Sequence, residues 1–357
     1  MIDIKKLVRK NIRNLIPYQS ARSIKSNGDI WLNANEMPFP KKNTFFFKNL
    51  NRYPRDEYSL LIRSYASYLN INKINILATR GSDEAIELLI KAFCEPKKDK
   101  IMFFPPTYDM YSIYSEILGI ESVKVFQLKK FKLDINTIKK NMNNIKIIFI
   151  CNPNNPTGTI IKKKDIIKIL KISHNKCLVV VDEAYIEFCI KKTSIDILKK
   201  YSNLVILRTL SKAFSLASIR CGFVISNYKI INVLKKIIAP YPLATPVLKI
   251  ALNAFSHSNL DYMKYKILKL YRNKNFLINK LKKNFHVKKI FPSYTNFLLV
   301  KFHSSKDVFN LFLKKKIISR DQSNKVFLKN CIRISIGTKK ECLSLLNSLV
   351  SKKKDIN

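Results

Sequence analysis

The sequence is poor in glycine, tryptophan and histidine, and it has no long hydrophobic segment. Its 357 residues include six glycines, one tryptophan and four histidines. Apolar residues come in short runs, and none approaches the ~18 consecutive apolar residues that cross a bilayer. Residues 1–23 are basic, but they contain Asp3 and lack the apolar centre of a signal peptide. We therefore expect a soluble, cytoplasmic protein with no membrane partner.

The seven cysteines form no Cys-x-x-Cys pair, and five of them stand inside apolar runs. Thiols in such runs behave as small core residues. Neither a disulfide framework nor a zinc site is indicated, and we expect no bound metal.

Acidic residues are scarce relative to basic ones. The chain has 67 lysines and arginines against 24 aspartates and glutamates, a formal net charge of +43. Clustered basic residues would indicate a nucleic-acid interface, but these lysines are spread through the chain among many isoleucines and asparagines. We interpret the charge as compositional drift and expect no specific nucleic-acid partner. A basic nucleic-acid-binding protein stays open as a distant alternative.

Hydrophobic residues make up 47% of the chain, which excludes a disordered basic tail. Between residues 74 and 224, short runs rich in valine and isoleucine alternate with helix-length segments. Such alternation predicts an α/β domain with a mainly parallel sheet covered by helices on both faces. The β-like runs are residues 74–79, 100–104, 145–151, 177–182, 204–209 and 221–225.

The sequence pattern changes after Pro240 and Pro242. Long lysine-rich helical stretches lead to a β-like run at 296–302, a helix near Val308 and a second β-like run from Cys331. We predict an N-terminal segment, residues 1–44, that packs with the small domain. The large domain is expected at 45–240 and a small α+β domain at 241–357.

Ligands of parallel sheets bind outside the carboxyl ends of the strands, so the polar residues after each strand are candidates for a site. In the turn at 80–84, Gly81 permits close backbone approach. The amides of Ser82 and Asp83 would lie at a helix N-terminus, which favours an anion. An ordinary helix cap is the alternative interpretation of this turn.

Two further segments place polar groups at strand ends. The loop 151–158 has two Asn-Pro steps and a glycine, a pattern that aims an asparagine amide at a ligand. At 182–185, Asp182 ends an apolar run, where a carboxylate needs a cation or hydrogen-bond donors. A structural helix cap is again the alternative.

The segment 209–222 closes another strand with Ser211 and Lys212, followed by Arg220 and Gly222. A single lysine in so basic a chain carries no information by itself. Together with a carboxylate thirty positions earlier and an anion-binding helix start, however, an amine at a strand end can serve pyridoxal phosphate.

From about residue 18 to residue 348 the chain resembles the histidinol-phosphate aminotransferases, a family of class II aminotransferases with the type I fold of pyridoxal-phosphate enzymes. The matching segments, in order, are LNANE (32–36), NRYP (51–54), RGSDEAIELL, PPTYDMYS, NPNNPTG, VDEAYIEF, RTLSKAF, RCGF, IAPYPLATP, TNFLLVKF, ISRDQ and CIRISIGT. The resemblance implies a large domain with a seven-stranded, mainly parallel sheet and a smaller α+β domain.

The resemblance also implies roles around the ring of pyridoxal phosphate. Lys212 would form the Schiff base and then act as general base. Asp182 would face the pyridine nitrogen and keep it protonated. Asn155 and Tyr185 would hydrogen-bond the ring oxygen, and Tyr108 would stack on the ring.

For the cofactor phosphate, the resemblance implies the amides of Ser82 and Asp83 together with Ser211 and Arg220. Tyr53 would reach the same phosphate from a neighbouring subunit, which implies a homodimer.

The substrates implied are histidinol phosphate and the pair glutamate and 2-oxoglutarate, in a ping-pong reaction of histidine biosynthesis. Arg320 and Arg333 match the two substrate-binding arginines of the family, and Tyr18 would assist at the same anion. Another aminotransferase of this fold, for aromatic amino acids, or a phospho-amino-acid decarboxylase remain the alternatives.

Overall fold

The computed structural model describes residues 29–35, 38–39, 54 and 56–350. Its large sheet has seven strands in the order β2-β8-β7-β6-β5-β3-β4. All pairs of neighbours are parallel except those of β8, which runs antiparallel to β2 and β7. The predicted α/β fold with a mainly parallel sheet is confirmed. The strands are β2 (Ile76–Thr79), β3 (Lys100–Phe103), β4 (Glu121–Lys124), β5 (Ile145–Cys151), β6 (Leu178–Asp182), β7 (Leu204–Thr209) and β8 (Gly222–Ser226).

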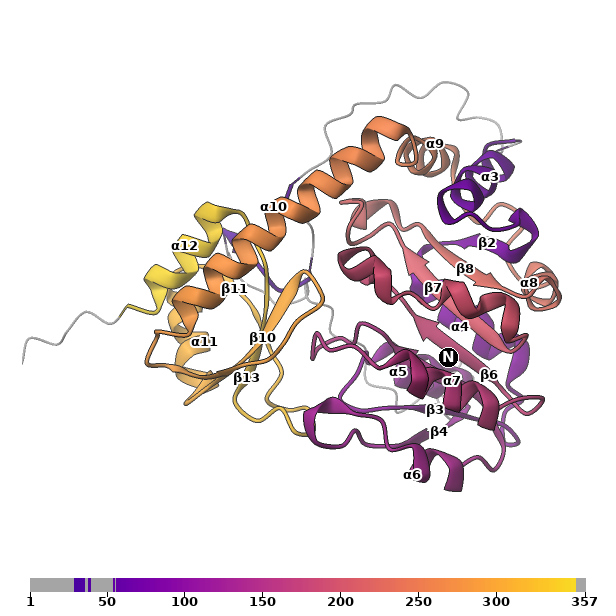
Figure 1. Ribbon diagram of the computed structural model, residues 1–357, viewed down its shortest axis with the longest axis horizontal. Helices are drawn as coiled ribbons and strands as arrows, with labels where there is room; N and C mark the ends of the chain where they lie inside the picture. The colour runs from indigo at the N-terminus through magenta and orange to yellow at the C-terminus, as the bar shows by residue number, and fades with distance from the viewer. Residues whose placement is uncertain (1–28, 36–37, 40–53, 55, 351–357) are drawn as a thin grey trace, which may run out of the picture.

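Helices cover both faces of this sheet (Figure 1). Alternation along β6 shows the two faces. Val180 belongs to the hydrophobic cluster that contains residues of α4, α5 and α8, whereas Val179 and Val181 belong to the cluster that contains residues of α3, α7 and α9. The inner strands of the sheet are mostly apolar because both of their faces are buried. The helices are α3 (Glu57–Leu69), α4 (Gly81–Phe93), α5 (Met110–Leu118), α6 (Ile135–Lys140), α7 (Lys163–Ile172), α8 (Tyr228–Lys235) and α9 (Thr245–Asn253).

The strand β4 is the one member of the large sheet that the apolar runs do not predict. It lies at the sheet edge and pairs only with β3. Its residues, Glu121 to Lys124, are partly or fully exposed. An edge strand with charged ends is a common way to prevent further strand pairing, and it leaves no hydrophobic signal in the sequence.

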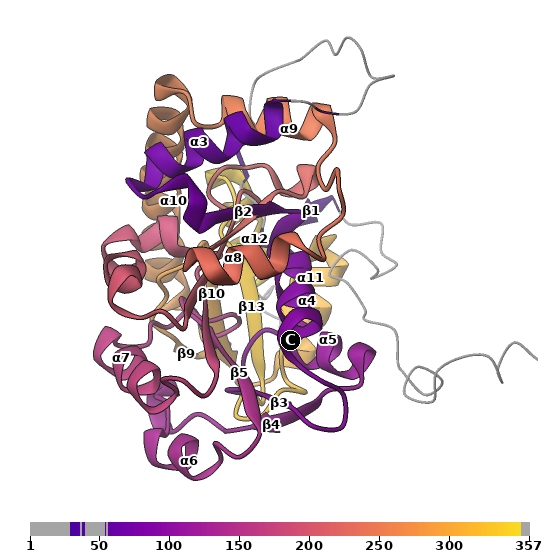
Figure 2. The same ribbon diagram turned by 90° about the vertical axis from the view of Figure 1, so that its right-hand side faces the viewer.

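The small domain is built on an antiparallel sheet in the order β12-β13-β10-β9. Figure 1 shows α10 running from α9, beside the large sheet, to α12 in the small domain, and Figure 2 shows the same arrangement from the side. A short parallel pair joins β1 to β11. The elements are α10 (His257–Leu281), α11 (Ser305–Lys314), α12 (Lys339–Ser348), β1 (Ile30–Trp31), β9 (Val287–Ile290), β10 (Phe297–Phe302), β11 (Ile317–Ile318), β12 (Arg320–Asp321) and β13 (Cys331–Ser335).

The domain boundaries predicted at residues 44 and 240 stay predictions, and most of the predicted N-terminal segment lies outside the described residues. Within the described part, β1 lies against the small domain through β11. Helix α9 packs on α3 of the large domain although it follows residue 240.

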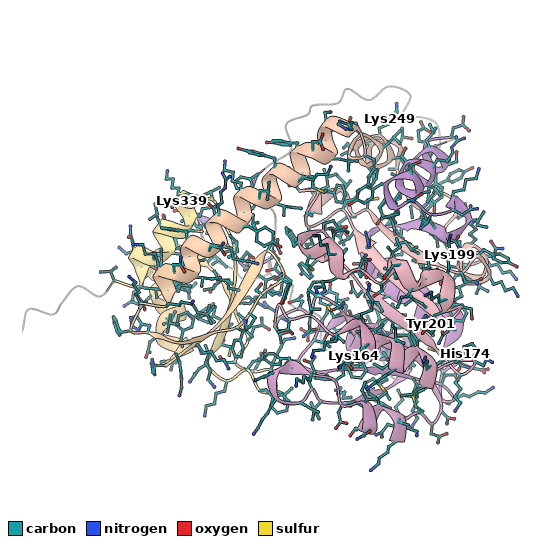
Figure 3. All side chains as sticks on the ribbon, viewed as in Figure 1. Lys164, His174, Lys199, Tyr201, Lys249 and Lys339 are labelled. Carbon is teal, nitrogen blue, oxygen red and sulfur yellow. The ribbon has the colours of Figure 1, made fainter. Side chains whose placement is uncertain are left out.

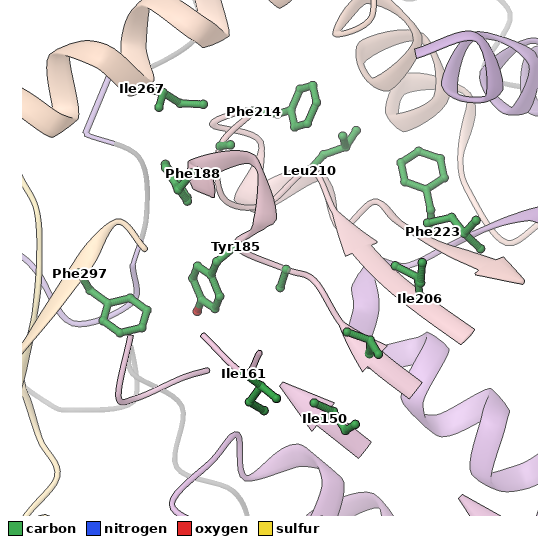
Figure 4. Packing of buried hydrophobic residues seen from close by; sticks show 14 of the residues in the cluster. Ile150, Ile161, Tyr185, Phe188, Ile206, Leu210, Phe214, Phe223, Ile267 and Phe297 are labelled. Carbon is green, nitrogen blue, oxygen red and sulfur yellow. The ribbon is translucent and has the colours of Figure 1, made fainter. Parts of the chain in front are cut away.

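The two domains share one hydrophobic core. The rings of Tyr185, which follows β6, and Phe297, in β10, meet edge to face with centroids 5.3 Å apart. Figure 4 shows these two rings next to each other, with Phe188 and Ile161 nearby. This contact brings the small-domain sheet against the carboxyl ends of the large-domain strands.

The surface lysines are spread over the molecule. Those labelled in Figure 3 come from α7, from residues 195–200, from α9 and from α12, which belong to both domains. Among the described residues, no helix is long and apolar enough to cross a membrane. The same residues contain no group of three histidine, cysteine, aspartate or glutamate side chains arranged to hold a metal.

Candidate active site

A cavity of about 550 Å³ lies where the carboxyl ends of β5, β6 and β7 meet the small domain. It brings together every predicted site residue that the structure describes. Tyr18 and Tyr53 lie outside the described residues. The predicted residues that line the cavity are Ser82, Asp83, Tyr108, Asn155, Asp182, Tyr185, Ser211, Lys212, Arg220, Arg320 and Arg333.

Asp182 is the last residue of β6 and is 2% exposed. In the described part of the chain its oxygens accept only from neutral donors, the Tyr111 hydroxyl at 2.8 Å and the Ala184 amide at 3.1 Å. Burial raises the pKa of Asp182 to about 6, although both hydrogen bonds lower it. A carboxylate so desolvated is stabilised by a cation placed against it.

Lys212 follows β7 in the neighbouring position of the sheet. Its Nζ donates to the Ala34 carbonyl oxygen at 3.3 Å and lies 5.7 Å from the centre of the Tyr185 ring. The amine therefore stands in the cavity between the end of the large sheet and the segment that follows β1.

The turn before α4 requires two glycines. Gly81 has φ +79°, and a Cβ on it would lie 2.8 Å from Nη2 of Arg220. Gly222 packs directly on this turn, because a Cβ there would lie 2.5 Å from the carbonyl carbon of Gly81 and 2.7 Å from the Ser82 nitrogen. The result is a helix N-terminus with its first amides at the cavity, which is a favourable place for an anion.

Arg220 covers this helix start. Its side chain is half exposed, and it donates to the Asp83 carboxylate at 3.2 Å and to the Ser211 hydroxyl at 3.4 Å. Asp83 also accepts from the Tyr108 hydroxyl at 2.8 Å. Three predicted phosphate-binding residues, Asp83, Ser211 and Arg220, and the predicted stacking tyrosine are thus held in one hydrogen-bonded group.

Asn155 and Tyr185 are fixed from the small domain and from the segment after β1. Nη1 of Arg333 donates to Asn155 Oδ1 at 2.5 Å. Asn35 donates from Nδ2 to the Tyr185 hydroxyl at 3.1 Å. Asn35 itself accepts a hydrogen bond from Asn296, so both domains take part.

Arg320 and Arg333 are direct partners in the antiparallel pair β12–β13. Both line the cavity. Like charges at directly opposite positions of two strands repel each other, so this arrangement favours an anion between or beside the two guanidinium groups.

These observations fit pyridoxal phosphate. The cofactor has a phosphate for the α4 N-terminus, a protonated pyridine nitrogen for Asp182 and an aldehyde for the amine of Lys212. The two small-domain arginines line the same cavity and favour an additional anionic group there.

Sequence reasoning missed several residues of this site. Tyr111 and Asn35 lie within the matched segments PPTYDMYS and LNANE, so closer attention to those segments would have indicated them. Thr107, Gln322, Asn324 and Lys325 also line the cavity, and no apolar pattern or motif marks the last two.

Comparisons with known proteins agree with this geometry. Residues 28–349 match the aminotransferase class I and II family. The histidinol-phosphate aminotransferase of Buchnera aphidicola subsp. Melaphis rhois is 53% identical over 349 residues, 97% of each chain. That of Salmonella typhi is 44% identical over 348 residues, 98% of this chain and 97% of the other.

Two solved structures have the same fold. The histidinol-phosphate aminotransferase from Clostridium acetobutylicum superposes with a TM-score of 0.80 at 27% identity, covering 90% of this chain and 98% of the other. The enzyme from Sinorhizobium meliloti, solved in complex with pyridoxal-5'-phosphate, gives a TM-score of 0.84 at 20% identity, covering 96% of each chain. At that identity the second likeness shows the fold alone.

The fold, the cavity and these relatives define a transaminase of the type I fold. The chain belongs to the aminotransferase class I and II family and, within it, to the histidinol-phosphate aminotransferases. The predicted family and enzyme class are therefore confirmed, and the alternative of a basic nucleic-acid-binding protein is not favoured.

Proposed function

We propose that the protein transfers the amino group of L-histidinol phosphate to 2-oxoglutarate, giving imidazole acetol phosphate and L-glutamate, with pyridoxal phosphate as cofactor. The observation that carries this proposal is one cavity containing an amine, a desolvated carboxylate, a helix N-terminus with Arg220, and two further arginines. The near full-length identity to named histidinol-phosphate aminotransferases supports the substrate and a place in histidine biosynthesis.

Each residue has one task on the cofactor side. When bound, pyridoxal phosphate supplies an electrophilic carbon and a ring that accepts the electrons released at the donor's α-carbon. Asp182 holds the proton on the pyridine nitrogen, which keeps the ring electron-deficient. Lys212 Nζ would be the base that takes the α-proton of the amino donor and the acid that gives a proton back during transfer of the amino group.

The residues around the cavity orient the cofactor. The Ser82 and Asp83 amides, Ser211 and Arg220 hold the phosphate. The Tyr108 hydroxyl donates to Asp83, which orients its ring, and this ring would stack against the cofactor. Asn155 and Tyr185 bond the ring oxygen, and their existing partners fix their direction.

Arg320 and Arg333 bind the anionic groups of the two donors in turn. A guanidinium fork accepts a carboxylate or a phosphate with similar geometry, so the same pair can serve histidinol phosphate and glutamate. Tyr18 is proposed to assist at this anion.

We also propose a cytoplasmic homodimer in which Tyr53 reaches the neighbouring subunit's cofactor phosphate. Seven free cysteines support a reducing compartment. Tyr241, which is 54% exposed, lines an apolar recess of about 300 Å³. Such an exposed apolar surface supports the proposal that a second subunit covers it. Light scattering would measure the dimer, and a monomer at micromolar concentration that binds cofactor fully would contradict it.

The test of function is optical and kinetic. The protein with added pyridoxal phosphate should absorb in the visible, glutamate should shift that band, and histidinol phosphate with 2-oxoglutarate should turn over. Lys212→Ala should abolish the shift. Faster turnover with phenylalanine would favour an aromatic aminotransferase, and release of carbon dioxide from a phospho-amino acid would favour a decarboxylase.

A further inference from the structure

Lys325 lies on the small-domain loop between β12 and β13 and reaches across the cavity mouth to the large domain. Its Nζ donates to the Thr107 carbonyl oxygen at 3.2 Å and to the Asp109 carboxylate. These two residues stand on either side of Tyr108, the residue expected against the cofactor ring. The side chain of Lys325 is only 19% exposed.

The loop between β12 and β13 is weakly held by the small-domain sheet, so a contact with the large domain is needed to fix it. β12 has two residues, lies at the edge of the small sheet and pairs only with β13. Arg320 is one of these two residues, so the sheet alone fixes the position of this guanidinium weakly. Directly after β12, the Lys325 amide donates to the Gln322 carbonyl at 2.9 Å, which makes a tight turn from the arginine to the lysine.

A second contact joins the same two segments. The rings of Phe126, which follows β4, and Phe327 meet edge to face with centroids 6.3 Å apart. The small-domain loop is thus held against the large domain at two points on one side of the cavity, one ionic and one aromatic.

The charges around Lys325 favour Asp109 as its partner. Burial is the main cause that lowers the pKa of Lys325, and Arg333 and Arg320 lower it further, while Asp109 opposes these effects. Three cations near one another would repel without the carboxylate.

We propose that Lys325 is a positioning residue that clasps the Thr107–Asp109 segment and so fixes Arg320 over the cavity, which sets the affinity for the anionic amino donor. This inference rests on the proposed function for its substrate. Lys325 acts through Arg320 and Tyr108, and it takes no part in proton transfer.

The test uses the cofactor-loaded protein and four variants, Lys325→Met, Asp109→Asn, the double variant and Lys325→Arg. The matched control is Lys329→Met, which removes an exposed lysine four residues along the same loop. Two kinds of measurement are made. One is the amide hydrogen exchange rate of residues 105–110 and 320–328, and the other is steady-state kinetics, which give KM and kcat for histidinol phosphate and for glutamate.

We expect Lys325→Met and Asp109→Asn each to speed exchange in both segments and to raise the KM for histidinol phosphate about fivefold, with kcat little changed. The double variant should match the single variants, since both remove one contact. Lys325→Arg should restore most of the affinity, and Lys329→Met should behave as the unaltered protein.

Three results would overturn the proposed positioning role of Lys325. Asp109→Asn could lower KM while Lys325→Met raises it, which would make Lys325 a direct substrate ligand. The increases in KM of the two single variants could add in the double variant. Amide exchange at residues 105–110 could also stay unchanged in Lys325→Met and Asp109→Asn. Amide exchange is measured without substrate. It therefore tests the contact between Lys325 and the Thr107–Asp109 segment even if histidinol phosphate is not a substrate and the proposed function is wrong.

Discussion

Arg333 of the small domain donates to Asn155 of the large domain at 2.5 Å, and its Nη2 donates to the Asn33 carbonyl oxygen at 2.8 Å. One guanidinium therefore joins Asn155, the asparagine proposed to bind the cofactor, to the segment after β1. It is 9% exposed and lines the cavity of the candidate active site. Its planar fork suits these simultaneous contacts, and a lysine ammonium cannot reproduce them.

Arg333→Lys should accordingly raise the KM for both amino donors by about tenfold or more, because charge-assisted hydrogen bonds are lost while the charge remains. Steady-state kinetics with histidinol phosphate and with glutamate measure the effect. Arg272→Lys, at an exposed position of α10, is the control and should leave both constants unchanged. An unaltered KM in Arg333→Lys would show that the guanidinium of Arg333 does not bind the amino donors.

The sequence predicted the elements that are apolar throughout and the polar residues at their ends. Asp182 could be placed because it ends the apolar run of β6, and Lys212 because it follows the mostly apolar strand β7 by three residues, so both mark the carboxyl edge of the sheet. The family resemblance then supplied their roles.

What the sequence could not predict depends on contacts between distant segments. Lys325 is one lysine among many until the fold brings it to Asp109, 216 positions away. The contact of Asn35 with Tyr185 spans 150 positions. β4 has no apolar pattern because it lies at an exposed edge.

Asp182 should make the cofactor-free protein less stable as the pH rises. Its pKa is raised to about 6 in the folded chain, against an ordinary value of ~3.9. Between these values the native state binds more protons than the unfolded state, so stability falls from pH 4 to pH 6 and the whole cost is present above pH 6.

Asp182→Asn cannot ionise, so the cofactor-free variant should be more stable than the unaltered protein at pH 8, by up to about 3 kcal/mol. The difference should vanish near pH 4. Denaturant unfolding at the two pH values measures it, and the same variant should lose transaminase activity. An equal difference at both pH values would show that the charge of Asp182 is not its cause.

Gly222→Ala should damage the anion site at the start of α4. The added Cβ would lie 2.5 Å and 2.7 Å from backbone atoms of Gly81 and Ser82, which cannot move aside as a flexible side chain would. We expect the affinity for pyridoxal phosphate to fall at least about tenfold and the stability to fall by about 1–3 kcal/mol. Fluorescence titration and denaturant unfolding measure the two effects.

The control is Gly119→Ala, at the C-cap of α5 with φ +71°. It should cost about 1 kcal/mol of stability through backbone strain but leave cofactor affinity unchanged. Equal losses of cofactor affinity in the two variants would indicate general destabilisation instead of a blocked phosphate site.

The buried ion pair behind the site should be the most sensitive charge contact in the large domain. Arg208 in β7 is 1% exposed, and its Nη2 donates to Glu183 at 2.9 Å, beside Asp182. Glu187 lies 3.8 Å from the same guanidinium, and burial raises its pKa to about 7 although Arg208 lowers it. Removing the arginine leaves two buried carboxylates without their cation.

Arg208→Met should therefore reduce the free energy of unfolding by about 3–5 kcal/mol at pH 8. The deficit should be smaller at pH 5, because Glu187, whose pKa burial raises to about 7, is protonated at that pH with or without the arginine and carries no charge. Lys163→Met breaks the exposed pair with Asp196 and should cost at most about 1 kcal/mol at either pH. Denaturant unfolding of both variants at both pH values provides the comparison, and a deficit in Arg208→Met that does not shrink at pH 5 would assign the loss to packing instead of charge.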